Sequence, residues 1–186
     1  SKLALTKVGT GTLTLSGANT YTGQTLISNG TLRLAGGDNR LYTGGAMYIE
    51  DNGTFDLNGR NQAVGSLTNA HGDILLNGGG VLSVGGGDIW AFGRVTRSGG
   101  LTKTGGGTLT FGCNTADYTG GTIVNAGRLW LYYGNNKLPV SGAVTVNSPG
   151  VLDLAHSNNP GSVQTIGALS GNGTVNIGNT GTAVNF

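Results

Sequence analysis

Proline, cysteine and charged side chains are all scarce in this chain of 186 residues. Proline occurs 3 times and cysteine once, and Asp, Glu, Lys and Arg together make up 10% of the residues, against about 25% in an average soluble protein. One cysteine, Cys113, excludes an intramolecular disulfide and a cysteine-rich metal site. The stability of the fold must therefore come from buried apolar side chains and backbone hydrogen bonds.

Long hydrophobic runs and an excess of charge of one sign are also missing. No stretch approaches the ~18 apolar residues that a membrane span needs, and no signal-peptide pattern opens the chain. The formal net charge is +2, and Lys and Arg are scattered singly. We therefore expect no nucleic-acid binding and no membrane insertion by this segment. If the protein is exported, its signal and any membrane anchor lie outside this sequence.

Glycine is the residue that the chain has in excess. There are 38 glycines among the 186 residues, roughly three times the ordinary usage of about 7%. Thr and Asn are also plentiful, and no segment keeps a helical period of apolar residues. Short β-branched runs between glycines indicate strands and tight turns rather than a disordered glycine-rich tract. The composition predicts an all-β protein.

Two long segments of the chain repeat each other. Residues 5–34 match residues 101–131, including the string Leu-Thr-Lys at the start of each. The match continues beyond them, with small insertions, at residues 46–57 and 143–154 and at residues 62–67 and 164–169. We therefore interpret the chain as a single domain, 1–186, made of two copies at approximately 1–97 and 98–186.

A shorter period runs inside each copy. A glycine, one further residue and then an apolar residue open an alternating strand, as at Gly11, where Leu13 and Leu15 point to one side and Thr12 and Thr14 to the other. The same opening recurs about every 20 residues, which is typical of the coils of a β-helix. The other openings are at Gly30, Gly53, Gly72, Gly107, Gly127, Gly150 and Gly173.

This period predicts a parallel β-helix, or solenoid. Its leucines stack into an inner apolar ladder, its threonines face water, and glycines such as Gly30 and Gly53 take a positive φ in the turns. We expect roughly eight to ten coils and a rod of about 40 Å, at ~4.8 Å per coil.

The repeated string itself resembles a known family. Residues 11–23, GTLTLSGANTYTG, followed by the Asn29-Gly30 turn, are similar to the autotransporter-associated β-strand repeat of bacterial passenger domains, and residues 101–131 carry the second copy. The loop from Cys113 to Asp117 departs from the usual pattern. The resemblance implies a right-handed β-helix, export through a Gram-negative-type envelope and an extracellular or cell-surface location. It transfers no catalytic residue.

The two ends of the pattern are apolar and lack polar caps. Leu3 and Leu5 lie near one end, and Val184 and Phe186 lie near the other. Uncapped solenoid ends expose strand edges that can pair with further strands. Two predictions follow: the chain is part of a longer surface passenger, or it is a protomer that stacks head to tail into a filament.

Right-handed β-helices also include enzymes that cleave polysaccharides, and these need paired carboxylates. Asp56 and Asp153 are equivalent in the two copies and are predicted to point outward, but they lie several coils apart. Glu50 and Asp51 are predicted to form a solvated turn. The remaining acids show no pairing either: Asp38, Asp73, Asp88 and Asp117. We therefore predict a protein that is not an enzyme.

Metal and cofactor sites are not predicted. His71 and His156 are not equivalent and have no companion ligand at the usual spacing. The string Gly-Gly-Gly-Asp at 85–88 is similar to a calcium-binding nonapeptide repeat but occurs once. The Asn-Gly-Thr strings are interpreted as turns rather than glycosylation sites: Asn29, Asn52 and Asn172.

Three aromatic side chains are candidates for surface binding. Trp130 and Tyr132 alternate with inward leucines and are predicted to face outward, as is Tyr48. Such rings can stack on sugar rings or on a neighbouring chain. The predicted function is an extracellular structural or adhesive β-helical rod whose partners are other copies, a polysaccharide or a host-cell surface. The alternative is a carbohydrate-binding or carbohydrate-cleaving β-helix.

Overall fold

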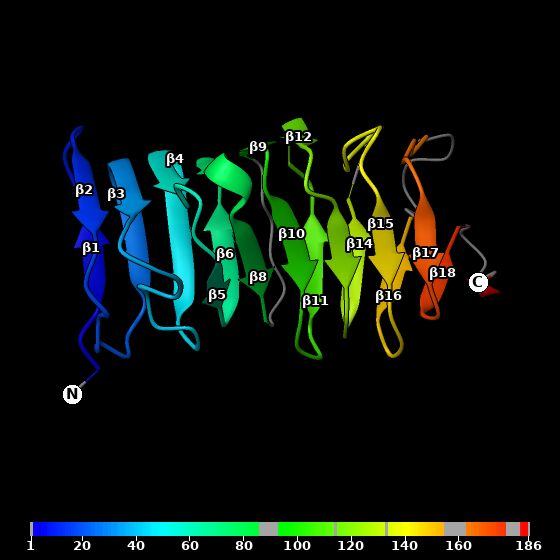
Figure 1. Ribbon diagram of the computed structural model, residues 1–186, viewed down its shortest axis with the longest axis horizontal. Coiled ribbons are helices and arrows are strands. Elements are labelled where there is room, and N and C mark those ends of the chain that lie inside the picture. The colour runs from blue at the N-terminus through cyan, green and yellow to red at the C-terminus, as the bar shows by residue number, and fades with distance from the viewer. Residues whose placement is uncertain are drawn as a thin grey trace.

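The chain forms a rod of stacked strands in the computed structural model (Figure 1). The structure describes residues 2–85, 93–113, 115–132, 134–154 and 163–177, and the backbone of residues 183–185. The strands lie side by side across the long axis, with the N-terminus at one end of the rod and the C-terminus at the other (Figure 1). The fold is a parallel β-solenoid, as predicted.

The strands form three sheets, and every described pairing is parallel except that of β18 with β19. The first sheet holds β1 (Leu5–Lys7), β2 (Thr12–Leu15), β3 (Thr25–Leu34), β4 (Ala46–Asp56), β6 (Ser66–Ala70), β7 (Asp73–Leu75), β9 (Arg94–Arg97) and β12 (Thr115–Tyr118). The second holds β5 (Gln62–Val64), β8 (Val81–Val84), β10 (Gly100–Lys103), β13 (Thr122–Val124), β15 (Val144–Val146) and β17 (Leu169–Gly171). The third holds β11 (Thr108–Phe111), β14 (Arg128–Leu131), β16 (Val151–Asp153), β18 (Thr174–Asn176) and β19 (Ala183–Asn185). A 3₁₀ turn, η1, spans Asn77–Gly79.

The solenoid has about seven turns, so the predicted count of eight to ten was too high. Leu5 pairs with Thr25 one turn on, as a period of about 20 residues requires. Towards the C-terminus, however, Val144 pairs with Leu169, so this turn takes 25 residues. Longer loops between the strands consume residues without adding turns.

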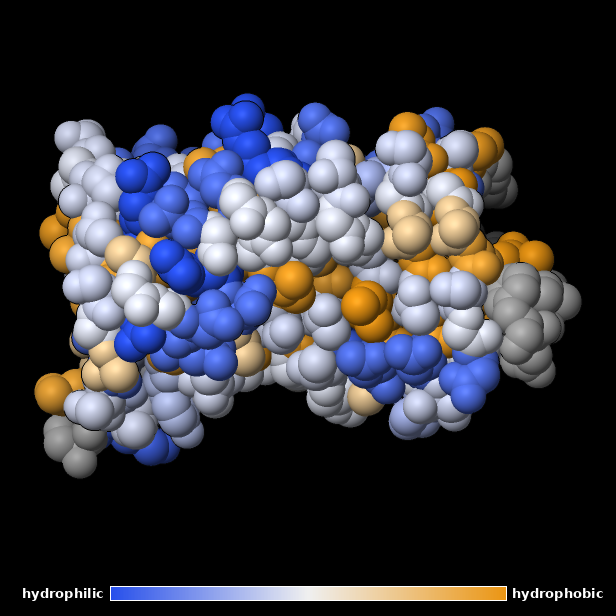
Figure 2. Space-filling view, in the orientation of Figure 1, coloured by the Kyte–Doolittle hydropathy of each residue, from blue (hydrophilic) through white to orange (hydrophobic). Residues whose placement is uncertain are grey.

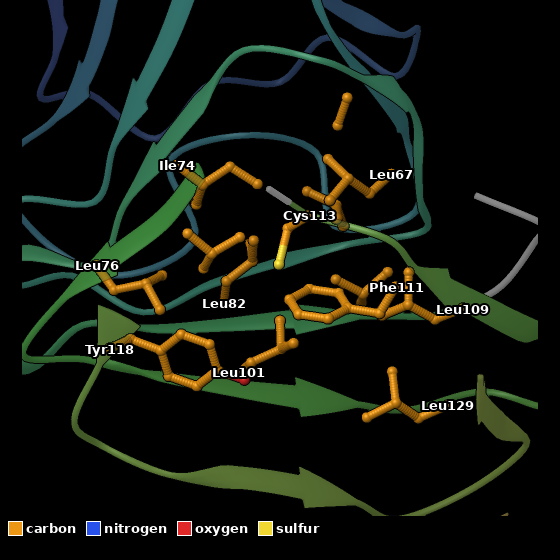
Figure 3. Packing of buried hydrophobic residues seen from close by; sticks show 14 of the residues in the cluster. Leu67, Ile74, Leu76, Leu82, Leu101, Leu109, Phe111, Cys113, Tyr118 and Leu129 are labelled. Atoms are coloured by element: carbon orange, nitrogen blue, oxygen red, sulfur yellow. The ribbon is translucent and has the colours of Figure 1, made fainter. Parts of the chain in front are cut away.

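The core consists of the inward residues of the strands, stacked turn upon turn. Leu32 pairs with Phe55 across the ladder, and both are fully buried. The same kind of stack surrounds Cys113, whose sulfur points into the interior among Phe111 and Leu82 (Figure 3). Burial at about 25 cal/mol per Å² of apolar surface is the main favourable contribution to folding.

Gly30 and Gly53 both lie at a corner between two faces, but their backbones differ. Gly30 has φ = 70°, as predicted, because β3 turns this corner with few residues. Gly53 is not in the left-handed region, so that prediction was wrong. β4 has one more residue than β3 at this corner, which relaxes the turn. Glycine is still required there because a Cβ would lie 2.4 Å from the carbonyl oxygen of Ile27.

The second copy is rotated about the axis relative to the first. Leu5–Lys7 pairs with Thr25–Ile27 in the first sheet. Leu101–Lys103, its equivalent in the second copy, lies instead in the second sheet, where it pairs with Leu82–Val84 and Thr122–Val124. One repeat unit therefore does not contain a whole number of turns. Equivalent residues of the two copies point in different directions around the rod.

We expect the substitution Gly127→Ala to destabilise the fold. Gly127 is the equivalent of Gly30, has φ = 64°, and a Cβ there would lie 2.3 Å from the carbonyl oxygen of Gly107. The free energy of unfolding, measured in urea, should fall by at least about 1–3 kcal/mol. Gly106→Ala is the control, since its Cβ meets nothing within 4 Å. Equal losses for both variants would contradict this account of the corner.

Candidate functional site

Several of the described carboxylates bond to residues one turn away. Asp73 accepts hydrogen bonds from Arg94, and Glu50 accepts one from Ser28. Asp38 accepts bonds from the backbone N–H and the side-chain amide of Asn61. Arg94 thereby lowers the pKa of Asp73, and the Asn61 backbone N–H lowers the pKa of Asp38. These acids tie neighbouring turns together.

Asp56 is predicted to be an outward residue, and its neighbours in fact cover it. Arg33 Nε donates to Asp56 Oδ2 over 2.8 Å, and Asn77 Nδ2 and the Asn58 N–H donate to Oδ1 over 2.8 and 2.9 Å. These contacts leave the carboxylate almost fully buried. A buried carboxylate needs such partners, because removing it from water is costly.

The second copy keeps this ion pair with a different arginine position. Asp153, the equivalent of Asp56, pairs with Arg128. Trp130 occupies the position equivalent to Arg33, and Arg128 stands two residues before it, with its guanidinium 5.3 Å from the centre of the indole ring. Asp56 and Asp153 lie on β4 and β16, which belong to different sheets. The structure therefore does not bring the two carboxylates to one substrate.

No metal-binding cluster is found in the described ranges, where no three His, Cys, Asp or Glu side chains come together. His71 Nδ1 lies 3.3 Å from Asp51 Oδ1 on the surface. His156 and Asp88 lie outside the described residues. Within the same ranges, no helix has the length and apolar character to cross a membrane.

Two buried lysines are features that the sequence analysis missed. Lys103 is fully buried, and the carbonyl oxygens of Gly85, Thr104, Gly105 and Ala126 all lie within hydrogen-bonding distance of its ammonium. These carbonyls come from three successive turns. Burial lowers the pKa of Lys103. The surrounding carbonyl oxygens can only accept hydrogen bonds, however, and so they favour the ammonium form, which has the most N–H groups to donate. The recurrence of Leu-Thr-Lys in both copies was the available signal.

Lys7, the equivalent lysine of the first copy, is buried in the same way. Its Nζ donates to the carbonyl oxygens of Val8, Gly9 and Asn29 over 2.9, 2.7 and 2.9 Å. The same position of the repeat thus places an ammonium among corner carbonyls in both copies. We call Lys7 and Lys103 the corner lysines. Their chemistry is structural, because each ammonium is surrounded by backbone oxygens of its own chain.

Trp130 and Tyr132 contact each other. Their ring centres are 5.4 Å apart in an edge-to-face arrangement, and the Arg128 guanidinium lies over the indole. Both side chains are half-buried. A ring already covered by a guanidinium and an aromatic edge has less surface left for a ligand. Tyr48 is on β4 of another sheet, so the structure does not unite the three predicted aromatics.

Tyr48 lies instead in a surface groove of about 530 Å³, which we call the Tyr48 groove. Polar side chains form most of the rest of its wall. The full lining is Leu26, Ser28, Tyr48, Glu50, Asp51, Asn52, Asn69 and His71. On the face drawn in Figure 2, apolar residues (orange) form interrupted patches between white and blue areas. Tyr48 is thus one of the three predicted binding residues, and it lines a concave site.

The predicted assembly ends are only partly described. Leu3 is 66% exposed, and Leu5 is half-buried on β1, the first strand of its sheet. Val184 belongs to β19, which pairs antiparallel with β18 rather than continuing the parallel stack. Phe186 lies outside the described residues. Binding of other copies through these ends stays a prediction.

Turns that bond only to neighbouring turns around one apolar core define a solenoid repeat protein. The family described as passenger-associated-transport-repeat matches residues 5–34 and 101–131. These are the two segments on which the resemblance inferred from the sequence rests, and that resemblance is confirmed.

A similar curated protein is "Adhesin BmaC autotransporter" of Brucella suis biovar 1 (strain 1330). The two are 34% identical over 207 residues, an alignment that includes 99% of this chain. The chain spans 6% of the length of that protein. No solved structure matches the chain.

We expect Lys103→Met to lower the free energy of unfolding by about 1–3 kcal/mol, because it leaves the partly buried carbonyl oxygens around the ammonium, such as that of Gly105, without this donor. Urea unfolding measures the loss. Lys2→Met, at an exposed lysine, should change nothing. A Lys103→Met protein as stable as the parent would show that the corner lysine does not stabilise the turns.

The stability of the protein should fall in alkaline solution because of Cys113. Burial raises the pKa of this thiol from 9.0 to about 12. The unfolded chain therefore ionises first, and the free energy of unfolding declines as the pH rises from about 9, by up to about 1.4 kcal/mol per unit. Urea unfolding at about pH 8, 9 and 10 measures this decline in the free energy of unfolding.

Cys113→Ala provides the control for the alkaline profile. Burial also raises the pKa of Tyr118, which contributes a decline in the same direction at higher pH. The difference between the parent and Cys113→Ala isolates the thiol. If the free energy of unfolding declined with pH equally steeply in the parent and in Cys113→Ala, the decline could not be assigned to the thiol.

Proposed function

We propose that the chain is a structural and adhesive segment of a bacterial surface passenger, without catalytic turnover. The observation that carries the proposal is the use of the acids as ties between turns. Asp56 with Arg33 and Asp153 with Arg128 are such ties, so the two equivalent acids of the repeat serve the fold rather than the paired chemistry that polysaccharide cleavage needs. The two passenger-associated repeats and the similarity to an adhesin support the same role.

The location we propose is the cell surface or the extracellular space of a Gram-negative bacterium. The support is the similarity of nearly the whole chain to a segment of an autotransporter adhesin. A low content of charge and an outer surface of Thr, Asn and Ser suit a rod that is hydrated mainly through hydroxyl and amide groups.

A segment of a longer passenger is favoured over a head-to-tail filament by the comparison, because nearly the whole chain aligns with 6% of the length of an adhesin. β19 occupies the edge of β18 as an antiparallel strand. In a stacked copy, that edge would have to accept the first parallel strand of the next molecule. A filament, like a solenoid that continues in the same chain, would therefore require β19 to move.

Adhesion and turnover can be tested separately. Beads coated with the purified chain should bind to epithelial cell monolayers above the level of beads coated with an unrelated β-solenoid. Incubation with a panel of plant and bacterial polysaccharides should release no new reducing ends. Beads that bind no better than the control would contradict the adhesive role.

The acid residues give the matched test of the non-enzymatic role. We expect Asp56→Asn and Asp153→Asn to lower stability while leaving bead adhesion of the folded protein unchanged, because both acids serve the fold. Release of reducing ends by the parent, and its loss in either variant, would overturn the proposal in favour of a carbohydrate-cleaving enzyme.

A further inference from the structure

The Tyr48 groove is formed by two successive corners that each contain an extra residue. At the first, the ladder passes from Ile27↔Ile49 to Asn29↔Asn52, so β4 has two residues where β3 has one. At the second, it passes from Tyr48↔Thr68 to Ile49↔Ala70, which leaves Asn69 unpaired. Such bulges push side chains out of the ladder and commonly occur beside functional sites.

The bulged residues form the rim of the groove. Asn69 has φ = 47°, a left-handed conformation that asparagine tolerates better than most residues. Glu50 and Asp51 are exposed, and the Asp51 side chain is 82% exposed. The corner therefore holds two carboxylates and an amide around Tyr48. Backbone geometry, and not side-chain flexibility, sets their positions.

The groove combines an aromatic ring with both hydrogen-bond donors and acceptors. Tyr48 is half-buried between Leu26 and Thr68 on the sheet, which holds its ring in place. Glu50 and Asp51 supply acceptors, and the Asn69 amide supplies both kinds of group. Hydroxyl groups also donate and accept. A ligand ring that has C–H groups on its face, to pack on Tyr48, and several hydroxyl groups at its edge would therefore complement the wall of the groove.

Both carboxylates of the groove already have a polar neighbour within the protein. Ser28 donates to Glu50, and His71 lies beside Asp51. A strongly cationic ligand is therefore not required, and an acidic sugar would meet the two carboxylates unfavourably. A volume of about 530 Å³ lies within the range of about 300–1,000 Å³ that small-ligand sites occupy.

The second copy lacks these groups. Thr145 stands at the position equivalent to Tyr48, where its hydroxyl lies 3.1 Å from that of Ser170. Asn147 and Ser148 stand in place of Glu50 and Asp51. The solenoid thus folds with either set of residues. The groove chemistry of the first copy is not required by the turn.

We propose that the Tyr48 groove binds a neutral saccharide. A pyranose ring packs on Tyr48, and its hydroxyls bond to Glu50, Asp51 and Asn69. This inference deepens the proposed adhesive role and rests on it, since it names the chemical class that the segment recognises. In this proposal the carboxylates accept hydrogen bonds from the sugar hydroxyls, and no bond of the sugar is cleaved.

Isothermal titration of the intact chain with cellotriose, mannotriose and N,N′,N″-triacetylchitotriose tests the proposal. At least one should bind with a Kd of about 1 mM or tighter. Tyr48→Thr, which installs the residue of the second copy, should weaken this binding by about tenfold or more. Tyr48→Phe retains the ring and should keep most of the affinity.

The titrations are accompanied by a control variant, by a test of folding and by a repeat in EDTA. Tyr132→Ala removes an aromatic that follows β14 and is not part of the groove lining, so it should leave the Kd unchanged. Thermal unfolding of every variant verifies the fold. Binding that persists in Tyr48→Thr, or that disappears with EDTA, would overturn the proposal. So would the absence of binding by the parent chain to all three probes. Bead adhesion that survives in Tyr48→Thr would leave the adhesive role standing and refute the groove as its basis.

Discussion

Backbone hydrogen bonding of each turn to the next, in register, is the interaction on which the rest of the structure depends. It places residues about one turn apart in direct contact, so Arg33 meets Asp56 and Arg128 meets Asp153. In a solenoid these short-range contacts replace the distant contacts of a globular core. Surface pairs of this kind contribute little when exposed, but covered ones such as Asp56 must be paired to be tolerated.

The corners impose the second constraint. Where the chain turns from one face to the next, several carbonyl oxygens point inward at the same place. The corner lysines satisfy them, and Gly30 and Gly127 leave room for the approach of the neighbouring turn. An ammonium can donate three hydrogen bonds in different directions, which no apolar residue could replace. The Leu-Thr-Lys string is therefore a structural signature of the corner.

The rotation between the two copies separates core chemistry from surface chemistry. Both copies bury equivalent residues, such as Leu32 and Leu129. The outward positions have diverged, with Tyr48 in one copy and Thr145 in the other. Because the copies also face different directions, any surface site built on one of them is presented on one side of the rod. Repetition of the core does not imply repetition of the ligand site.

The sequence by itself determined the parallel solenoid, the inward leucines and the family resemblance, because strand alternation and the glycine period are local properties of the chain. It also indicated Gly30 correctly. It gave no means of counting the turns, of seeing that Asp56 is covered, or of finding the Tyr48 groove. Those features depend on which residue lies one turn away. The tertiary structure alone decided this, because bulges and loop lengths change the number of residues per turn.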